Sequence, residues 1–358
     1  MEPLALGSQR QILFDRYLVA EAKGFELRTI EGIKDGPVLT QQAPWEANGI
    51  WAWVSVLYEN GVVRLWYDAI GEDGVWRVAY AVSTDGVHFV RPNLGLYEYK
   101  GSRANNICFV GPKGYHAGSV FYDPAAPADE RYKLVYGGGG AIGDTPYLHI
   151  ALAVSPDGLH WHHASDQIIP WYTDTMNVAF YDPATQTYKL YVRYWTGKLR
   201  YEKDQLVGRE DYGRRGVGFA ESKDLRTFAA PELVLAPDDE DPADMDLYNS
   251  AARKYPLADC AYLIFTSAFH HHADALDVQI ATSRDGRHWE RPDRRPAITL
   301  GPVGAFDSEQ IYVAAGEADV GDEIWLYYGG YDVGHNVARP GKCSAAIGRV
   351  RWLRDRFV

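Results

Sequence analysis

Five short polar segments lie just before apolar, strand-like stretches, and they contain the side chains best suited to chemistry. These segments are residues 44–48, 115–118, 174–177, 246–249 and 306–309. Four of the five carry a carboxylate. Carboxylates gathered in a partly dry pocket shift each other's pKa values, so that one can act as an acid and another as a base. The pattern therefore predicts acid–base chemistry wherever the fold brings these segments together.

The elements that would position these segments belong to an internal repeat. The pattern Ala-x-Ser-x-Asp-Gly-x-x-aromatic, called the tag below, recurs with small departures at residues 81–89, 153–161, 220–228 and 281–289. The interval is about 60 to 70 residues, a little above the usual length of a propeller blade. Asp-Gly is a strong hairpin signal when apolar residues alternate on both sides. Each tag therefore predicts the turn between the last two strands of a repeated unit.

An aromatic-rich strand precedes each tag, and a fifth copy of this strand follows the last tag. The five strands begin near Val62, Tyr132, Tyr188, Ala261 and Ile324, and another apolar segment with a polar turn precedes each of them. Five such units predict an all-β fold, a five-bladed β-propeller with four-stranded blades around a central channel. A β-sandwich with accidental internal similarity is the alternative.

The whole chain, residues 1–358, is expected to be one such domain. Its blades would span about residues 41–100, 101–168, 169–235, 236–300 and 301–358. Residues 1–40 precede the first blade and could supply an outer strand that closes the last one. In a propeller the inner strands run beside the channel, so the five polar segments would meet at one mouth of that channel.

Composition and charge exclude several classes of function. The 358 residues carry a formal charge of −12, with 36 basic against 48 acidic residues, which argues against a nucleic-acid partner. Three scattered cysteines, Cys108, Cys260 and Cys343, form neither a disulfide framework nor a CxxC metal motif. No signal peptide and no membrane-length apolar run is visible. We therefore expect a cytoplasmic protein, or the mature form of a secreted or periplasmic one, with no membrane partner.

The chain resembles the five-bladed β-propeller glycoside hydrolases, the group around families 32, 43, 62, 68 and 117, and especially a divergent bacterial branch. The tag, the carboxylates before the inner strands, residues 14–28 and the Pro-Trp-Glu of residues 44–46 carry this resemblance over nearly the whole chain. It implies a glycosidase or transglycosidase that acts on an oligosaccharide or polysaccharide. It implies no required cofactor, although a structural calcium ion in the channel would fit such relatives.

The resemblance also implies roles for individual residues. In those families a carboxylate at the start of blade one is the nucleophile or general base, which matches Glu46, and a blade-three carboxylate is the general acid, which matches Asp174. Two departures stand out: Trp45-Glu46 replaces the Asp of the family-32 pattern, and His116 stands where a blade-two Asp is expected. The catalytic set could therefore be rearranged, with Asp307 or Glu309 of blade five taking a role.

The predicted catalytic residues are Glu46, Asp174 and Glu309. The predicted substrate-binding residues are Trp45, His116, Asn177, Arg193, Tyr248, Asn249, Asp307 and His335. Each has a structural alternative: Glu46 could be a solvated loop residue, and Asp174 could cap a turn. The Asp123 of a Tyr-Asp-Pro turn is expected to be structural.

The expected reaction is hydrolysis through an oxocarbenium-like transition state, in which one carboxyl group protonates the leaving oxygen while the other activates water or attacks the anomeric carbon. A non-catalytic carbohydrate-binding propeller is one alternative. A glycoside phosphorylase of similar fold is another, and it would need a basic clamp for phosphate. The arginines available for such a clamp are Arg193, Arg200, Arg214 and Arg215.

Three further features are weaker signals. The run His270–His272 could supply metal ligands, but neighbouring residues on a strand point to opposite faces, so a surface or pocket-rim position is the preferred interpretation and no metal is predicted. Gly137–Gly140 lacks the lysine of a phosphate-binding loop. The charged stretch from residue 200 to 215 predicts a long loop, which could wall a substrate pocket, contact another subunit or simply be mobile.

Overall fold

A computed structural model describes residues 5–142, 145–202, 205–208, 210–337 and 345–358 of the chain. The described part is all-β, with only two short 3-10 helices, η1 (Pro44–Glu46) and η2 (Ala128–Glu130). Aromatic and β-branched residues are frequent in the strands, as expected for pleated, half-buried structure. None of the helices in this part has the length and apolar character needed to cross a membrane.

Three antiparallel sheets of four strands each follow one another along the chain. The first contains β2 (Gly49–Glu59), β3 (Val62–Ile70), β4 (Trp76–Ser83) and β5 (Ile107–Phe109). The second contains β6 (His116–Tyr122), β7 (Tyr132–Ile142), β8 (Thr145–Ser155) and β9 (His162–Ile169). The third contains β10 (Val178–Asp182), β11 (Thr187–Trp195), β14 (Arg215–Ser222) and β15 (Glu232–Leu235).

The remaining strands form one larger sheet that has two parts. The first part contains β16 (Met245–Leu247), β17 (Ala251–Lys254), β18 (Tyr262–His270), β19 (Ala275–Ser283) and β20 (Trp289–Glu290). The second contains β21 (Gln310–Val313), β22 (Ala318–Val320), β23 (Glu323–Tyr331), β24 (Ala346–Leu353) and β1 (Ile33–Thr40). A single parallel pair, Leu276 with Gln310, joins the two parts. Because β1 pairs with β24, strands from opposite ends of the chain share this sheet.

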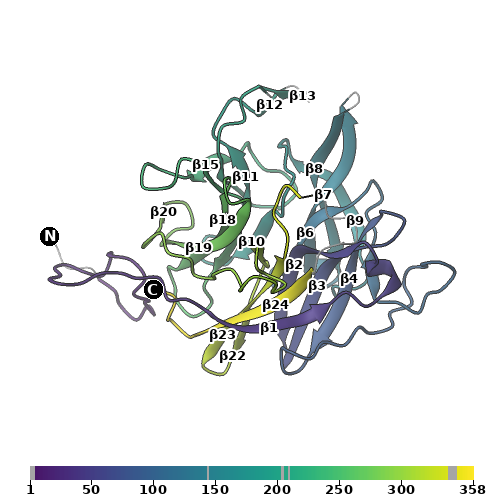
Figure 1. Ribbon diagram of the computed structural model, residues 1–358, viewed down its shortest axis with the longest axis horizontal. Helices are drawn as coiled ribbons and strands as arrows, with labels where there is room; N and C mark the ends of the chain where they lie inside the picture. Colours follow the sequence, from purple (N-terminus) through teal and green to yellow (C-terminus); the bar gives the residue numbers. More distant parts are fainter. Residues whose placement is uncertain (1–4, 143–144, 203–204, 209, 338–344) are drawn as a thin grey trace.

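A small ribbon replaces part of the predicted long loop between β11 and β14. Strands β12 (Arg200–Glu202) and β13 (Gln205–Val207) pair with each other and with no other described strand. Residues 203–204 and 209 of the predicted loop, like Cys343 elsewhere, lie outside the described residues. Figure 1 shows this ribbon projecting from the body of the molecule.

Hydrogen bonds join the first strands of successive sheets. The Ser55 hydroxyl on β2 accepts a bond from Val120 N on β6 (2.9 Å), and the Ser119 hydroxyl on β6 donates to the Asn177 carbonyl before β10 (2.6 Å). After β21, Ala315 N donates to the Val54 carbonyl of β2 (2.9 Å), so the last and first sheets also meet. Figure 1 shows β2, β6 and β10 near the middle of the molecule and β9, β15 and β20 farther out. This arrangement is consistent with a β-propeller.

Apolar side chains fill the spaces between neighbouring sheets. Trp66 and Tyr80 of the first sheet, for example, pack with Leu134 and Ala151 of the second. This burial removes large aromatic surfaces from water, which is the main favourable contribution to folding.

The four tags form one recurring turn after the third strand of a sheet. In the first tag the Asp85 carboxylate accepts bonds from Val87 N (2.9 Å) and His88 N (2.8 Å), and Gly86 adopts a φ of +74°. The same pair of carboxylate bonds recurs at Asp157, Asp224 and Asp285. The repeated sequence pattern is therefore a repeated turn. In each copy the aspartate carboxylate accepts the hydrogen bonds of backbone N–H groups in the turn.

Candidate functional site

A pocket of about 480 Å³ lies where β11 ends and β14 begins, at the end of the third sheet opposite its tag. Its walls include the aromatic residues Tyr172, Trp195 and Tyr212. Its charged and titratable lining residues are Asp174, Arg214, Arg215, Asp244, Asp246 and His271. Aromatic walls with a few converging polar groups are typical of a small-molecule site.

Asp174 is the accessible carboxylate of this pocket that was predicted from the sequence. Its side chain is 34% exposed, and it forms an ion pair with Arg193, whose side chain is fully buried. Arg193 also donates to the Tyr248 carbonyl (2.8 Å), and its guanidinium lies 4.0 Å from the centre of the Tyr248 ring. Burial alone would lower the pKa of Arg193, but the Asp174 and Tyr248 interactions outweigh it and raise that pKa. Arg193 is thus a fixed cation that orients Asp174.

A second carboxylate, Asp246, lies beneath the same pocket. Its side chain is 6% exposed, and it accepts bonds from Arg215 Nη1 (2.6 Å) and from the Arg215 backbone N–H (3.1 Å). His271 Nε2 lies 3.0 Å from Asp246 Oδ2, while 43% of the His271 side chain is exposed. A carboxylate accepts hydrogen bonds when ionised, so this contact places the proton on Nε2 and orients the ring. An oriented, accessible histidine is suited to act as a general acid or base.

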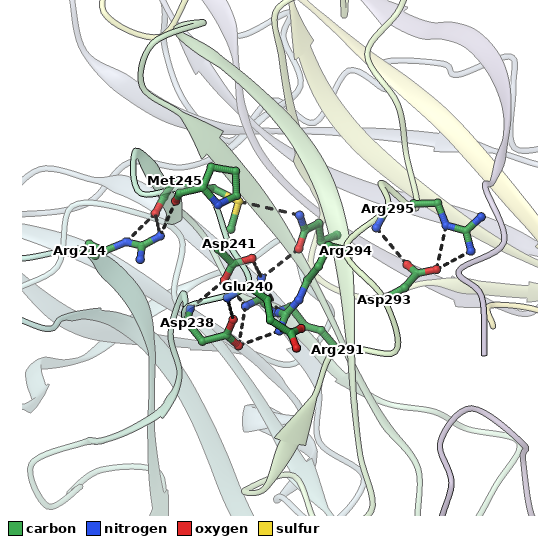
Figure 2. Close-up of polar contacts among 11 residues, drawn as sticks. Arg214, Asp238, Glu240, Asp241, Met245, Arg291, Asp293, Arg294 and Arg295 are labelled. Carbon is green, nitrogen blue, oxygen red and sulfur yellow. Dashed lines mark hydrogen bonds and ion pairs between the residues drawn. The ribbon is translucent and has the colours of Figure 1, made fainter. Parts of the chain in front are cut away.

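The loop that leads to Asp246 is fixed by buried ion pairs. Figure 2 shows Arg291 and Arg294 directed at the carboxylates of Asp238 and Asp241. Arg291 Nη1 lies 2.8 Å from Asp241 Oδ1, and neither side chain is appreciably exposed. From the other side, Arg214 Nε donates to the Met245 carbonyl (2.8 Å), as Figure 2 also shows. The pocket wall made by this loop is therefore held from both sides.

His116 lies beside the pocket, among tryptophans. Its ring centre is 4.8 Å from that of Trp76 and 6.5 Å from that of Trp53. Burial lowers the pKa of His116 to about 4; the Arg193 charge adds to this effect, and the Asp174 charge opposes it. The imidazole is therefore neutral at neutral pH. Its Nδ1 and the Trp53 Nε1 are buried without a partner in the described part of the chain.

Tyr248, predicted from the sequence, lies next to Arg193, and His335, also predicted, packs against Tyr248. The His335 ring centre is 4.7 Å from that of Tyr248, and His335 Nδ1 is 3.0 Å from the Tyr312 hydroxyl. The structure thus brings Asp174, Arg193, His116 and Tyr248 into one neighbourhood, with His335 at its edge.

Glu46 does not join this group, and the prediction that it is a catalytic carboxylate does not fit its position. Its side chain has no exposed surface. The carboxylate accepts bonds from the Tyr67 hydroxyl (2.6 Å), Arg91 Nε (2.9 Å) and the backbone N–H of Gln42 (2.9 Å) and Ala43 (3.0 Å). These bonds cap the η1 turn and use the acceptor capacity of the carboxylate. The neighbouring Trp45 donates to Asn106 (2.7 Å) inside the first sheet.

Asp307 also has a structural position. It is buried, forms an ion pair with Lys34 of β1 (2.8 Å) and accepts a bond from the Tyr328 hydroxyl (2.8 Å). Glu309 is half-buried at the start of β21, where its backbone N–H bonds to the Tyr331 carbonyl (3.0 Å). The Glu309 carboxylate has no hydrogen bond or ion pair within the described residues.

The two predicted amide ligands are engaged inside the fold. The Asn177 side chain accepts a bond from Thr173 (3.0 Å) and donates to the Thr175 carbonyl (2.9 Å). Asn249 is buried, and its amide oxygen accepts a bond from Ser267 N (2.8 Å). Both side chains therefore support the segments that precede the inner strands.

Sequence reasoning missed Asp246, His271 and Trp195 as site residues. Asp246 stood in the fourth polar segment, so its position was visible, but the buried partners that hold it were not. In the His270–His272 run each histidine pairs with its own aspartate: His270 with Asp277 (3.2 Å), His271 with Asp246 (3.0 Å) and His272 with Asp244 (2.8 Å). Among the described residues, no three potential ligands cluster closely enough to hold a metal ion.

Comparisons with known proteins point to one kind of fold. No protein-family model matches the chain, and no curated protein matches its sequence. Solved structures do match. One described as a glycoside hydrolase has a TM-score of 0.62 at 12% identity, over 90% of this chain and 92% of that one. An N-acetylgalactosamine deacetylase from F. plautii, in complex with the blood group B trisaccharide, has a TM-score of 0.61 at 17% identity, over 92% and 96%.

A third structure comes from work on the GH130 family of mannoside phosphorylases, which contains glycoside hydrolases that target β-1,2 mannosidic linkages in Candida mannan. It has a TM-score of 0.57 at 13% identity, over 92% of this chain and 96% of that one. At these identities the likeness shows the fold alone, which this chain shares with glycoside hydrolases of propeller fold.

Proposed function

We propose that this protein is a glycoside hydrolase that cleaves an oligosaccharide in the pocket beside Asp174. The observation that carries the proposal is the pairing of Asp174 with the buried Arg193 in an aromatic-walled pocket. A sugar ring needs an aromatic surface for its apolar face and hydrogen-bonding groups for its hydroxyls, and this pocket offers both. The structural likeness to carbohydrate-active enzymes also supports a carbohydrate substrate.

In this proposal Asp174 is the carboxylate that activates water or attacks the anomeric carbon. We assign it this role, rather than the acid role that the family resemblance implies, because it lies against the positive charge of Arg193. The second group, which protonates the leaving oxygen, is either His271, oriented by Asp246, or Glu309, whose carboxylate makes no hydrogen bond or ion pair within the described residues. The two carboxyl groups of a glycosidase face each other across the scissile bond, and their separation decides between retention and inversion.

We further propose that the fold has five blades. Three blades are the separate four-stranded sheets, and the larger sheet counts as two because a single parallel pair joins its halves. A small cavity supports this count, since it is lined by residues from β2, β6, β10, β17 and the segment after β21, which includes Ala315. These are the five inner strands expected around a central channel.

The test is hydrolysis of aryl glycosides and natural oligosaccharides by the wild type and by Asp174→Asn. The variant keeps the shape and removes the charge, so we expect a loss of about a hundredfold or more in kcat/KM. Asp166→Asn, at an exposed carboxylate on β9, is the matched control and should leave activity unchanged. His271→Gln and Glu309→Gln then identify the second group. Full activity in Asp174→Asn would overturn the assignment, and sugar binding without cleavage would favour a carbohydrate-binding propeller.

Phosphorolysis is the second candidate, because Arg214 and Arg215 border the same pocket and Arg193 lies behind it. The side chain of Arg200, the fourth arginine considered from the sequence, lies outside the described part. The same assay with and without inorganic phosphate separates the two reactions. A phosphorylase would release a sugar 1-phosphate and depend on phosphate, whereas a hydrolase would do neither.

A further inference from the structure

Arg214 is a positive charge on the pocket wall without a negative partner. Its side chain is half-buried, with Nε donating to the Met245 carbonyl (2.8 Å) and Nη2 to the Pro242 carbonyl (3.0 Å). Both acceptors are neutral, and among the described residues no carboxylate lies within ion-pair distance of Arg214. The two carbonyls hold the guanidinium in place, as Figure 2 shows for Met245. The charge is therefore fixed in position but not neutralised.

The three carboxylates that line the pocket with Arg214 each have another hydrogen-bond or ion-pair partner. Asp174 pairs with Arg193, and Asp246 pairs with both Arg215 and His271. Asp244, at the rim, bonds to His272 (2.8 Å). Arg214 thus remains the cation of the pocket wall whose charge the described residues leave unpaired.

Two guanidinium N–H groups remain available on this wall. Arg214 Nη1 and Arg215 Nη2 make no hydrogen bond within the described chain, and neither is among its buried unpartnered atoms. Both residues line the pocket, beside the aromatic pair of Trp195 and Tyr212, whose ring centres are 5.1 Å apart. Guanidinium groups prefer oxyanions, which accept two parallel N–H bonds at once. A ligand that binds along this wall is therefore expected to have a ring, which packs on the aromatic pair, and a negatively charged group beside that ring.

We propose that the pocket binds an acidic sugar, a pyranose with a carboxylate at C6, and that Arg214 and Arg215 bind this carboxylate. The inference rests on the proposed function, because it names the substrate class of the same pocket. Arg214 binds and positions the sugar, while the reacting atoms stay with Asp174. A neutral hexose would leave the Arg214 charge unpaired, so the site discriminates between two sugars that differ only at C6.

The experiment measures affinity for three matched pairs by calorimetry: glucose and glucuronate, galactose and galacturonate, mannose and mannuronate. The acidic member of at least one pair should bind about tenfold or more tightly than its neutral partner, as expected for a charge-assisted contact. Arg214→Met should abolish this preference, whereas Arg214→Lys, which keeps the charge but loses the guanidinium bonds to the two carbonyls, should retain part of it. Raising the salt concentration should weaken only the acidic member.

Arg226→Met is the matched control. Arg226 lies in the tag beyond the other end of β14, where it pairs with Glu130 (2.9 Å), so its loss removes one positive charge without touching the pocket. The sugar preference should not change. Thermal unfolding of each variant shows whether the loop near Met245 stays folded, and Arg214→Lys keeps the test valid if Arg214→Met unfolds.

The outcomes separate this inference from the proposed function. The inference would be overturned if both members of every pair bound equally, or if no acidic sugar bound. In that case, cleavage of a neutral glycoside that depends on Asp174 would still support the hydrolase proposal. Binding of inorganic phosphate that depends on Arg214, with no preference for acidic sugars, would also overturn the inference and favour phosphorolysis. Loss of cleavage in Asp174→Asn, together with the predicted preference for acidic sugars, would support both the hydrolase proposal and the acidic-sugar inference.

Discussion

Two Arg–carboxylate pairs in this protein differ mainly in what surrounds them. Asp174 with Arg193 and Glu46 with Arg91 are chemically alike, but the Asp174 side chain is 34% exposed and that of Glu46 is not exposed at all. In one pair the arginine is buried and the carboxylate faces a pocket, and in the other the carboxylate is the buried member. Packing, not residue type, therefore decides which carboxylate can reach a substrate.

The Glu46 position leads to a prediction about stability. Glu46→Gln should lower the free energy of unfolding by about 3 kcal/mol, because it leaves Arg91 without its counter-charge next to buried partners. Urea denaturation, with Asp166→Asn as the control for an exposed carboxylate, measures the change. Activity per folded molecule should stay within about twofold of the wild type. A stable variant whose activity fell a hundredfold would instead return Glu46 to catalysis, on the scale expected for an acid or base.

At the scale of single residues, the sequence predicted the positions of only some of the pocket residues. Asp174 could be predicted because its segment precedes an inner strand, and that position follows from the repeat. The burial of Glu46 could not, since it depends on Arg91, which lies 45 residues further on and outside the tag. The role of His271 was hidden for the same reason, because its partner Asp246 belongs to a different segment.

The tags show how a local turn can also join neighbouring sheets. The Gly86 carbonyl accepts a bond from the Tyr327 hydroxyl of β23 (2.9 Å), and that of Gly158 accepts one from Trp66 Nε1 of β3 (2.7 Å). The Gly286 carbonyl bonds to the Tyr191 hydroxyl of β11 in the same way (2.6 Å). The turn thus connects two strands of its own sheet and also contacts a neighbouring sheet, the preceding one for Gly158 and Gly286.

A pair of glycine substitutions tests this second role. At Gly86, with φ +74°, an added Cβ would lie 2.5 Å from the Trp325 ring and 2.8 Å from the Tyr327 hydroxyl. At Gly74, with φ +70°, it would meet nothing within 4 Å. Both Gly→Ala changes incur the cost of the left-handed backbone, about 1–2 kcal/mol. Gly86→Ala should cost about 1–3 kcal/mol more, because it also forces the two sheets apart.

Chemical denaturation of both variants measures the difference in unfolding free energy between Gly86→Ala and Gly74→Ala. Equal destabilisation would mean that the contact between Gly86 and β23 tolerates the added methyl group, and the tag would then be a turn only.

At the element scale the sequence predicted the tags well, because their chemistry is local: serine, aspartate and glycine within four residues define the turn. It did not predict the β12–β13 ribbon, which was expected to be loop. Three-residue strands that pair only with each other have no alternating pattern long enough to recognise.

At the scale of the whole molecule, strands from opposite ends of the chain pair with each other. Strand β1 pairs with β24, and Lys34 of β1 reaches Asp307 in the segment before β21. The segment before β1 adds Ile12 and Phe14 to the core that also contains Trp352. The edge of this sheet is therefore covered by non-covalent contacts made within the first 40 residues of the sequence.

Deleting residues 1–40 tests the importance of this pairing. Loss of Ile12 and Phe14 alone should cost roughly 2–5 kcal/mol each, and the uncovered edge of β24 can pair with other chains. We expect a lower unfolding temperature and aggregation in size-exclusion chromatography. Deleting residues 1–9, which keeps β1 and both core side chains, should have little effect. A monomeric, fully stable protein after the longer deletion would show that β1 is dispensable.

The β1–β24 pairing also sets an order of events during synthesis on the ribosome. Residues 33–40 leave the exit tunnel early, but their partner at residues 346–353 is made only after nearly all of the chain between them. The intervening sheets can form one after another as they emerge, as domains folding during translation commonly do. Until synthesis reaches β24, the early segment lacks its partner strand, and a helper that shields it would act in that interval.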